Sequence, residues 1–245
     1  MKALIVDAGN TRTVAVAWPG ATALPDPNRD PVPLDPVGSW PAGAAADPAF
    51  LAVATGVPVV LVSVVPAETD RLRVHVPHLV TVDCHLDLPF ATAVEDLAAV
   101  GPDRLANMAA ARAAGLDDAL VVDAGTATTF DLLKDGCFLG GMIAPGMAFA
   151  ARRLGEEAAR LDPVPFEPAD ARVGAGTAAA MKAGAWHTGT GGVEATIGRI
   201  LAEYGPVPVI LTGGLGHHLV WPAAHHDPHW TLRGAAFLVL GDPSD

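Results

Sequence analysis

The chain has 245 residues, of which 51% are hydrophobic and 17% are charged, and its formal net charge is -12. This composition is typical of a globular protein with a hydrophobic core and excludes a largely disordered chain. The acidic excess argues against nucleic acid as a main partner, because such binding depends on clustered lysine and arginine side chains. It does not argue against ATP, which a few local donors can hold.

No segment predicts a targeting or membrane-spanning element. The longest apolar run, residues 57–65, covers about half of a membrane span, and the N-terminal run is too short for a signal peptide. The two cysteines, Cys84 and Cys137, have no paired spacing, so neither a disulfide framework nor a zinc site is expected. We therefore predict a cytoplasmic protein that does not bind membranes.

One segment of eleven residues occurs twice. Residues 3–13 read ALIVDAGNTRT and residues 119–129 read ALVVDAGTATT, with seven identical positions. Each copy is an apolar, β-branched run followed by Asp-Ala-Gly and small polar residues, which predicts a buried strand that ends in a tight turn. A repeat at about half the chain length indicates two related α/β lobes, residues 1–116 and 117–245.

The other elements follow from composition and periodicity. Residues 19–48 are rich in proline, aspartate, glycine and alanine, so we expect mostly loop there. Helices are predicted at 101–115, 174–189 and 192–203. Further strands are predicted at 57–65, 79–82, 207–211 and 237–240.

The turn of the first copy is suited to bind phosphate. Gly9 permits close approach of the backbone to an anion, Asn10 and Thr11 supply short donors, and Arg12 adds positive charge. Asp7, at the end of the strand, is a candidate ligand for Mg2+, which usually keeps several waters and few carboxylates.

The second copy adds Asp123 and the hydroxyls of residues 126–129, and a third turn, Thr212-Gly213-Gly214, follows another apolar strand. Any one of these turns alone is as consistent with an ordinary strand ending. Their repetition favours a site that grips a triphosphate from more than one side. The chain has neither a GxxxxGK[ST] nor a GxGxxG motif, which excludes P-loop and Rossmann nucleotide sites.

The motifs as a set resemble those of type III pantothenate kinases in identity, order and spacing over most of the chain. They are DAGNTR at Asp7, SVVP at Ser63, GPDR at Gly101, DAGTATT at Asp123, LGGMIAPGM at Leu139, GAGT at Gly174 and TGG at Thr212. The resemblance implies a duplicated actin-like (ribonuclease-H-like) two-lobed α/β fold and a homodimer. It also implies transfer of the ATP γ-phosphoryl group to the primary hydroxyl of pantothenate, the first step of coenzyme A synthesis.

The resemblance also implies roles for individual residues. Asp103 corresponds to the catalytic base and Asp123 to the ligand of a monovalent cation, K+ or NH4+. The implied pantothenate site consists of Val94, Gly101, Pro102, Asp103, Arg104 and Thr177. The implied ATP site consists of Asp7, Ala8, Gly9, Asn10, Thr11, Arg12, Thr13, Val14 and Thr126.

The chemistry agrees with these roles. A carboxylate that deprotonates an alcohol is what phosphoryl transfer needs besides positioning and charge neutralisation, and the Arg104 guanidinium can pair bidentately with the carboxylate of pantothenate. Without the resemblance, Asp103 and Arg104 are more readily explained as a helix-start aspartate and a solvated arginine. Val94 stands where the family commonly has an aromatic residue, which predicts an altered pocket.

Two other functions stay open at the level of sequence. A regulatory accessory protein can keep the nucleotide site and act by binding a partner, and a kinase of another small hydroxy acid can share the same motifs. The histidines near the C-terminus, His217, His218, His225, His226 and His229, form no recognised metal-binding motif. We interpret them as solvated loop residues.

Overall fold

The computed structural model describes residues 2–20, 23–43 and 47–241. The chain groups into two compact units. The first comprises Met1–Ala119, Asp131–Gly140 and His229–Asp245, and the second comprises Leu120–Phe130 and Gly141–Pro228. The lobe boundary between residues 116 and 117, expected from the repeat, stays a prediction.

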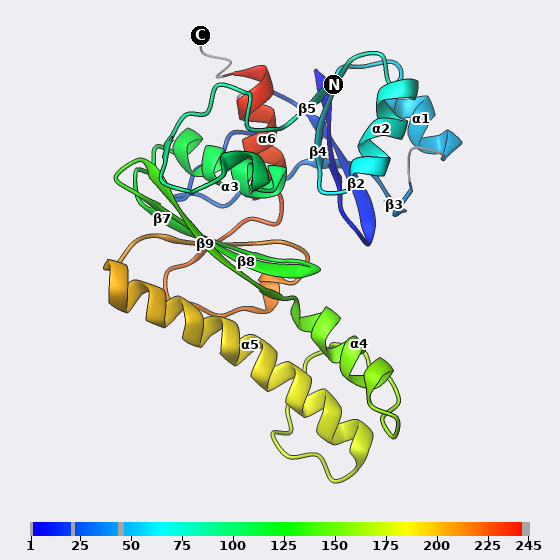
Figure 1. The fold of residues 1–245 in the computed structure, drawn as a ribbon, viewed down its shortest axis with the longest axis vertical. Helices are drawn as coiled ribbons and strands as arrows, with labels where there is room; N and C mark the ends of the chain where they lie inside the picture. Colours follow the sequence, from blue (N-terminus) through cyan, green and yellow to red (C-terminus); the bar gives the residue numbers. More distant parts are fainter. Residues whose placement is uncertain (1, 21–22, 44–46, 242–245) are drawn as a thin grey trace. The chain divides into compact units, whose positions relative to one another are not determined.

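A five-stranded sheet in the first unit has the order β3-β2-β1-β4-β5 (Figure 1). Its strands are β1 (Ala3–Ala8), β2 (Arg12–Trp18), β3 (Asp35–Pro41), β4 (Val59–Ser63) and β5 (Leu79–Thr81). β1 is antiparallel to β2 and parallel to β4. Because β1 lies inside the sheet, nearly all of its residues are buried. The strands predicted at the first repeat, at 57–65 and at 79–82 are confirmed.

Helices α1 (Pro48–Ala54) and α2 (Pro66–His75) contribute to the core of this sheet. Phe50 of α1 and Leu72 of α2 are fully buried against Leu4, Val6 and Leu61. This apolar cluster fixes the strand ends that carry the first repeated turn.

The prediction of mostly loop for residues 19–48 is wrong for Asp35–Pro41, which form β3; residues 21–22 and 44–46 lie outside the described part. β3 is the edge strand paired with β2, a position that tolerates proline because half of its backbone donors face away from the sheet. Its Trp40 ring packs edge-on against Phe50, with 5.1 Å between the centroids.

The first unit also contains two closely packed helices, α3 (Pro102–Ala113) and α6 (Trp230–Leu240) (Figure 1). α3 confirms the helix predicted at 101–115. The strand predicted at 237–240 is wrong, because these residues are the last turn of α6. α6 is buried over most of its surface, so its apolar residues do not alternate with polar ones. The hydrophobic periodicity of such a short apolar run cannot distinguish a buried helix from a buried strand.

Arg233 of α6 is a buried cation that fastens the proline-rich segment. Its Nη1 and Nη2 atoms donate to the carbonyl oxygens of Ala23 and Val32, each at 2.6 Å. Trp230 is fully buried and donates from Nε1 to the carbonyl oxygen of Asn107 at 3.0 Å. These bonds tie α6 to the proline-rich segment and to α3.

A second sheet has the order β11-β10-β7-β8-β9-β6. Its strands are β6 (Ala91–Thr92), β7 (Ala119–Ala124), β8 (Ala127–Lys134), β9 (Cys137–Pro145), β10 (Val209–Thr212) and β11 (His225–His226). β7 and β10 confirm the strands predicted at the second repeat and at 207–211. β8 and β9 are joined by Asp135 and Gly136, with φ of 50° and 68°, as a two-residue hairpin turn requires.

Helices α4 (Met147–Glu157) and α5 (Thr177–Tyr204) pack together in the second unit. The prediction of separate helices at 174–189 and 192–203 is wrong, since α5 is continuous over 28 residues. Glycines at 189, 191 and 192 suggested a break, but a helix held by packing tolerates them. None of the helices in the described residues is long and apolar enough to cross a membrane. Short 3-10 turns, η3 (Leu97–Ala99) and η4 (Gly216–His218), complete the chain.

Candidate active site

The first repeated turn lies at the end of β1 with its polar side chains exposed. The Gly9 N–H donates to the carbonyl oxygen of Arg12 at 3.0 Å and closes the turn. Asn10, Thr11 and Arg12 are exposed, whereas Asp7 is half-buried at the strand end. Three residues with potential donors are therefore exposed in the turn that follows this half-buried carboxylate.

The fold brings the SVVP and GPDR segments to this turn. Ala8 pairs with Ser63 in the sheet, and the N–H of Val64 donates to the carbonyl oxygen of Ala8 at 3.3 Å. The Val64 side chain in turn lies 4.0 Å from where a Cβ of Gly101 would be. Three of the sequence motifs thus meet at one end of the first sheet, although they are separated by about 40 to 90 residues. The parallel pairing of β1 and β4 places the first turn and SVVP at the same edge.

Asp103 occupies the first turn of α3 in a half-buried position. Its Oδ1 atom accepts a hydrogen bond from the Arg104 N–H at 2.9 Å. Burial raises the pKa of Asp103, and this effect outweighs the backbone hydrogen bonds and the Arg104 charge, which lower it. A raised pKa makes the carboxylate a stronger base than an exposed aspartate.

Arg104 is held by a buried ion pair, so the alternative of a solvated arginine is wrong. Its Nε and Nη2 atoms lie 2.7 Å and 2.5 Å from Oδ1 of Asp131 on β8, and its Cζ atom lies 5.5 Å from the centroid of the Phe138 ring on β9. Only 14% of the Arg104 side chain is exposed. The Nε side of the guanidinium is occupied, which leaves the end formed by Nη1 and Nη2 for a ligand.

Val94 lies directly after β6, next to β9. The N–H of Ala93 donates to the carbonyl oxygen of Phe138 at 3.0 Å, and a Cβ on Gly140 would lie 3.5 Å from Cγ1 of Val94. Val94 therefore borders the strand whose Phe138 supports Arg104. Its role in substrate binding stays a prediction.

In the second unit, the turn of the second repeat packs against two glycine-containing segments. The N–H of Gly146 donates to the carbonyl oxygen of Thr126 at 3.1 Å, and the N–H of Leu215 donates to the carbonyl oxygen of Ala124 at 2.9 Å. Gly213 has φ of +83°, and any side chain there would collide with Asp123 and Ala124. The predicted third turn is thus adjacent to Asp123.

Gly146 was not among the predicted site residues, although it lies in the LGGMIAPGM motif. A side chain at this position would collide with the carbonyl oxygens of Gly125 and Thr126. A glycine immediately after an apolar strand, inside a motif already noted, is the sequence signal that identifies such a close backbone contact. Gly146 therefore shapes the Asp123 turn through its lack of a side chain.

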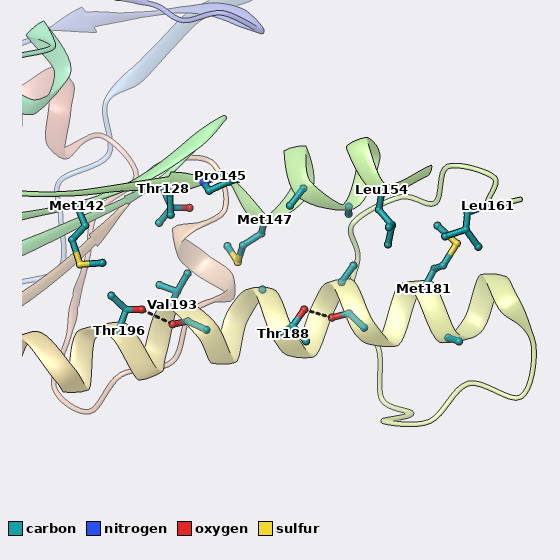
Figure 2. Close-up of a pocket in the computed structure, with 18 of the residues that line it drawn as sticks. Thr128, Met142, Pro145, Met147, Leu154, Leu161, Met181, Thr188, Val193 and Thr196 are labelled. Atoms are coloured by element: carbon teal, nitrogen blue, oxygen red, sulfur yellow. Dashed lines mark hydrogen bonds between the residues drawn. The ribbon is translucent and has the colours of Figure 1, made fainter. Parts of the chain in front are cut away.

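Thr177 is the first residue of α5 and is exposed. It lies at one end of a groove of about 840 Å³ between α4 and α5, whose lining is mostly apolar. Figure 2 shows Met147 and Leu154 facing Met181 and Val193 of α5 across this groove. The sequence predicted helices in this region but no groove between them.

The C-terminal histidines do not assemble into a metal centre in the described part of the chain, where no group of three or more His, Cys, Asp or Glu could hold a metal ion. His218 instead packs against Trp186, with 5.0 Å between ring centroids, and against His217 at 3.8 Å. Burial, with a smaller effect of His217, lowers the pKa of His218. This favours the neutral ring expected in an aromatic cluster.

Comparison with known proteins agrees with the motifs. The model of the family "Type III pantothenate kinase" matches residues 3–199. The type III pantothenate kinase of Acidiphilium cryptum (strain JF-5) is 33% identical over 257 residues, which cover 98% of this chain and 95% of that protein. That of Jannaschia sp. (strain CCS1) is 35% identical, covering 86% of this chain and 85% of that protein.

Solved structures confirm the predicted fold class. A conserved Campylobacter jejuni protein assigned to the Baf family of transcriptional activators superposes with a TM-score of 0.62 at 20% identity, over 99% of this chain and all of that one. Lmo2764 of Listeria monocytogenes, assigned as an N-acetylmannosamine kinase, superposes with a TM-score of 0.51 at 14% identity, over 98% and 99%. At such identities the likeness concerns the fold alone, the two-lobed actin-like kinase fold.

The family match covers the first repeat, GPDR and the second repeat, and the relatives share about a third of their residues over nearly the whole chain. This chain belongs to the type III pantothenate kinase family.

Proposed function

We propose that the chain transfers the γ-phosphoryl group of ATP to the primary hydroxyl of pantothenate, the first step of coenzyme A synthesis, with Asp103 as general base. The observation that carries this proposal is the half-buried Asp103 carboxylate, whose pKa burial raises and whose Oδ1 the Arg104 N–H fixes. In this proposal, Asp103 accepts the proton of the attacking alcohol. Phosphoryl transfer asks little more of a protein than this, together with positioning and charge neutralisation.

Pantothenate would bind beside the first turn of α3. Arg104 would direct the Nη1 and Nη2 end of its guanidinium toward the substrate carboxylate, since its Nε side is held by Asp131. Gly101 and Pro102 would pack against the substrate chain, and Val94 would leave more room in the pocket than an aromatic residue. Thr177 is the remaining candidate contact.

ATP would bind at the repeated turns. The exposed Asn10, Thr11 and Arg12 supply donors and a positive charge, Thr126 adds a hydroxyl, and Gly213 lets backbone approach the nucleotide. Within the predicted ATP segment, Thr13 is buried on β2. A buried residue there would stabilise the turn and would not contact ATP directly.

We infer that two cations take part in the reaction. Asp7 is a half-buried carboxylate at a strand end, suited to Mg2+ that keeps waters and phosphate oxygens as its other ligands. Asp123 lies in a turn that packs closely against Gly213, where a side chain would collide with its Oδ1 atom, and it is the proposed carboxylate ligand of K+ or NH4+. Such cations would supply charge neutralisation to an acidic chain that has few lysines.

The test is a direct assay of the product. The purified protein is incubated with Mg-ATP and pantothenate, with and without K+, and 4'-phosphopantothenate is followed by mass spectrometry. Product that diminishes without K+ supports both the reaction and the cation. A folded protein that binds ATP but yields no product with pantothenate contradicts the proposal, and product with another hydroxy acid alone would reassign the acceptor.

We further propose that the chain works as a cytoplasmic homodimer, in the compartment that supplies ATP. The support is the apolar surface of the second unit: Met142, Ile143 and Leu154 are 48%, 67% and 50% exposed, and two of them line the α4–α5 groove. Exposed apolar surface of this extent is typical of a protein interface. A second copy of the chain is the occupant that the family resemblance implies.

Leu154→Asp is therefore expected to convert the dimer to a monomer. A carboxylate in an apolar interface would be desolvated without a partner, whereas the half-exposed position leaves the fold of the protomer intact. Light scattering coupled to gel filtration measures the mass. Val74→Asp, at a 79%-exposed residue of α2, is the matched control and should keep the dimer. A wild-type protein that elutes as a monomer would contradict the proposed assembly.

A further inference from the structure

Asp131 is a buried carboxylate that none of the sequence motifs identified as functional. It lies on β8 and is fully buried, and its Oδ1 atom accepts from both Nε and Nη2 of Arg104. A buried carboxylate is strongly unfavourable unless it is paired with a cation and hydrogen-bonded. The cation it pairs with belongs to the GPDR segment, so this buried ion pair joins β8 to one residue of the proposed substrate site.

The ion pair limits how Arg104 can move. Asp131 fixes the Nε side of the guanidinium, and the Phe138 ring, itself buried, lies 5.5 Å from Cζ. An arginine side chain has several rotatable bonds, and two such contacts restrict them together. The Nη1 and Nη2 end is then presented in one orientation before any ligand arrives.

Arg104 also links this pair to the proposed base. Its backbone N–H donates to Oδ1 of Asp103 at 2.9 Å, so the residue that Asp131 holds by its side chain orients Asp103 by its main chain. Asp131 itself is fully buried, and its side chain is connected to the ligand site through Arg104.

We infer that Asp131 is a positioning residue for phosphorylation, which acts by holding Arg104 in the orientation that binds the carboxylate of the acceptor. The inference rests on the proposed function, because it takes pantothenate as the acceptor. The inference predicts that loss of Asp131 affects one substrate and not the other. Binding of the acid substrate should weaken, and ATP binding should stay unchanged. A residue needed only for stability would not separate the two substrates.

Asp131→Asn keeps the shape of the side chain and one acceptor oxygen but removes the charge from both hydrogen bonds. We expect the KM for pantothenate to rise on the order of 10- to 100-fold, as for loss of a charge-assisted contact. The KM for ATP should stay within about twofold. Steady-state kinetics with each substrate varied in turn gives both values. Asp118→Asn, which removes the partially exposed partner of Lys134 at the other end of β8, is the matched control and should change neither KM.

Arg104→Gln and the double variant Arg104→Gln/Asp131→Asn decide whether Asp131 acts through Arg104. The KM for pantothenate of the double variant should equal that of Arg104→Gln alone, since the inference has Asp131 act on this KM through Arg104. Asp131→Asn leaves the arginine without its charged partner and can therefore fail to fold. The double variant removes both charges, so it can still be compared with Arg104→Gln in that case. A further rise in the double variant would show an independent role and overturn the inference.

The wild-type assay separates the two levels of proposal. No product from pantothenate overturns the proposed function and the inference with it. An active wild type whose Asp131→Asn variant shows equal increases in both KM values overturns the inference alone.

Discussion

Asp103→Asn is expected to lower kcat by about 10²- to 10⁴-fold, the usual contribution of a positioned general base. Asparagine keeps the Oδ1 acceptor for the Arg104 N–H, so the first turn of α3 and the KM values should change little. Without a carboxylate, the alcohol must lose its proton to water. Steady-state kinetics on the folded variant measures this loss, and Asp47→Asn, which alters the N-cap of α1, is the control that should retain full activity.

The same variant should be more stable than wild type at neutral pH. Because burial raises the pKa of Asp103 above its ordinary value of 3.8, the folded protein binds this proton more tightly than the unfolded chain does. The free energy of unfolding therefore decreases as the pH rises from 3.8 through the raised pKa of Asp103. Above the raised pKa, the full destabilisation by the ionised, buried carboxylate persists. Asparagine avoids this cost.

Thermal unfolding and rate measurements against pH test this linkage. The melting temperature of Asp103→Asn should exceed that of wild type at pH 7, and the difference should vanish below pH 3.8. In wild type, kcat/KM should fall on the acid side with an inflection above 3.8, since only the ionised carboxylate can accept a proton. A variant that keeps wild-type activity at pH 7 would remove Asp103 from the mechanism.

The sequence predicted the parts of the fold that depend on local pattern. Both repeated segments are strands followed by turns, and α3 lies where its alanine-rich run and terminal glycine indicated. The repeated strands, their turns and α3 need no knowledge of side-chain partners. The parallel pairing of β1 and β4 explains why SVVP lies at the same edge of the sheet as the first turn, whereas the position of GPDR depends on contacts that the sequence does not indicate.

The remaining features depend on contacts between residues distant in sequence. Nothing in the region around Asp131 indicates that it pairs with Arg104, 27 positions earlier, so the strongest constraint on the proposed substrate arginine was missed. For α6, the run Phe237–Leu240 is apolar in a way that suits either a strand or a buried helix, and packing against α3 decides for the helix. The glycines of α5 predicted a break that tertiary packing overrides.

Gly234→Ala is expected to destabilise the protein by about 1–3 kcal/mol or more, the usual range for overpacking a core. Gly234 lies where α6 crosses α3, and an added Cβ would collide with the Ala106 carbonyl oxygen and lie 2.9 Å from the Ala110 nitrogen. The atoms in the way are backbone, so relief requires the helices to separate. Urea unfolding of the variant gives the free-energy change.

Gly191→Ala, in the interior of α5, is the matched control with the opposite sign. Nothing lies within 4 Å of its added Cβ, and alanine in a helix interior is more favourable than glycine by about 0.5–1 kcal/mol. The same substitution should therefore stabilise one helix and destabilise the other. Separation of α6 from α3 would also displace the helix that carries Asp103, so Gly234→Ala should lose activity while Gly191→Ala keeps it. Equal free energies of unfolding for the two variants would mean that the backbones of α3 and α6 are farther apart than the Gly234 contact requires. Packing of α6 against α3 would then not be what holds Asp103 in position.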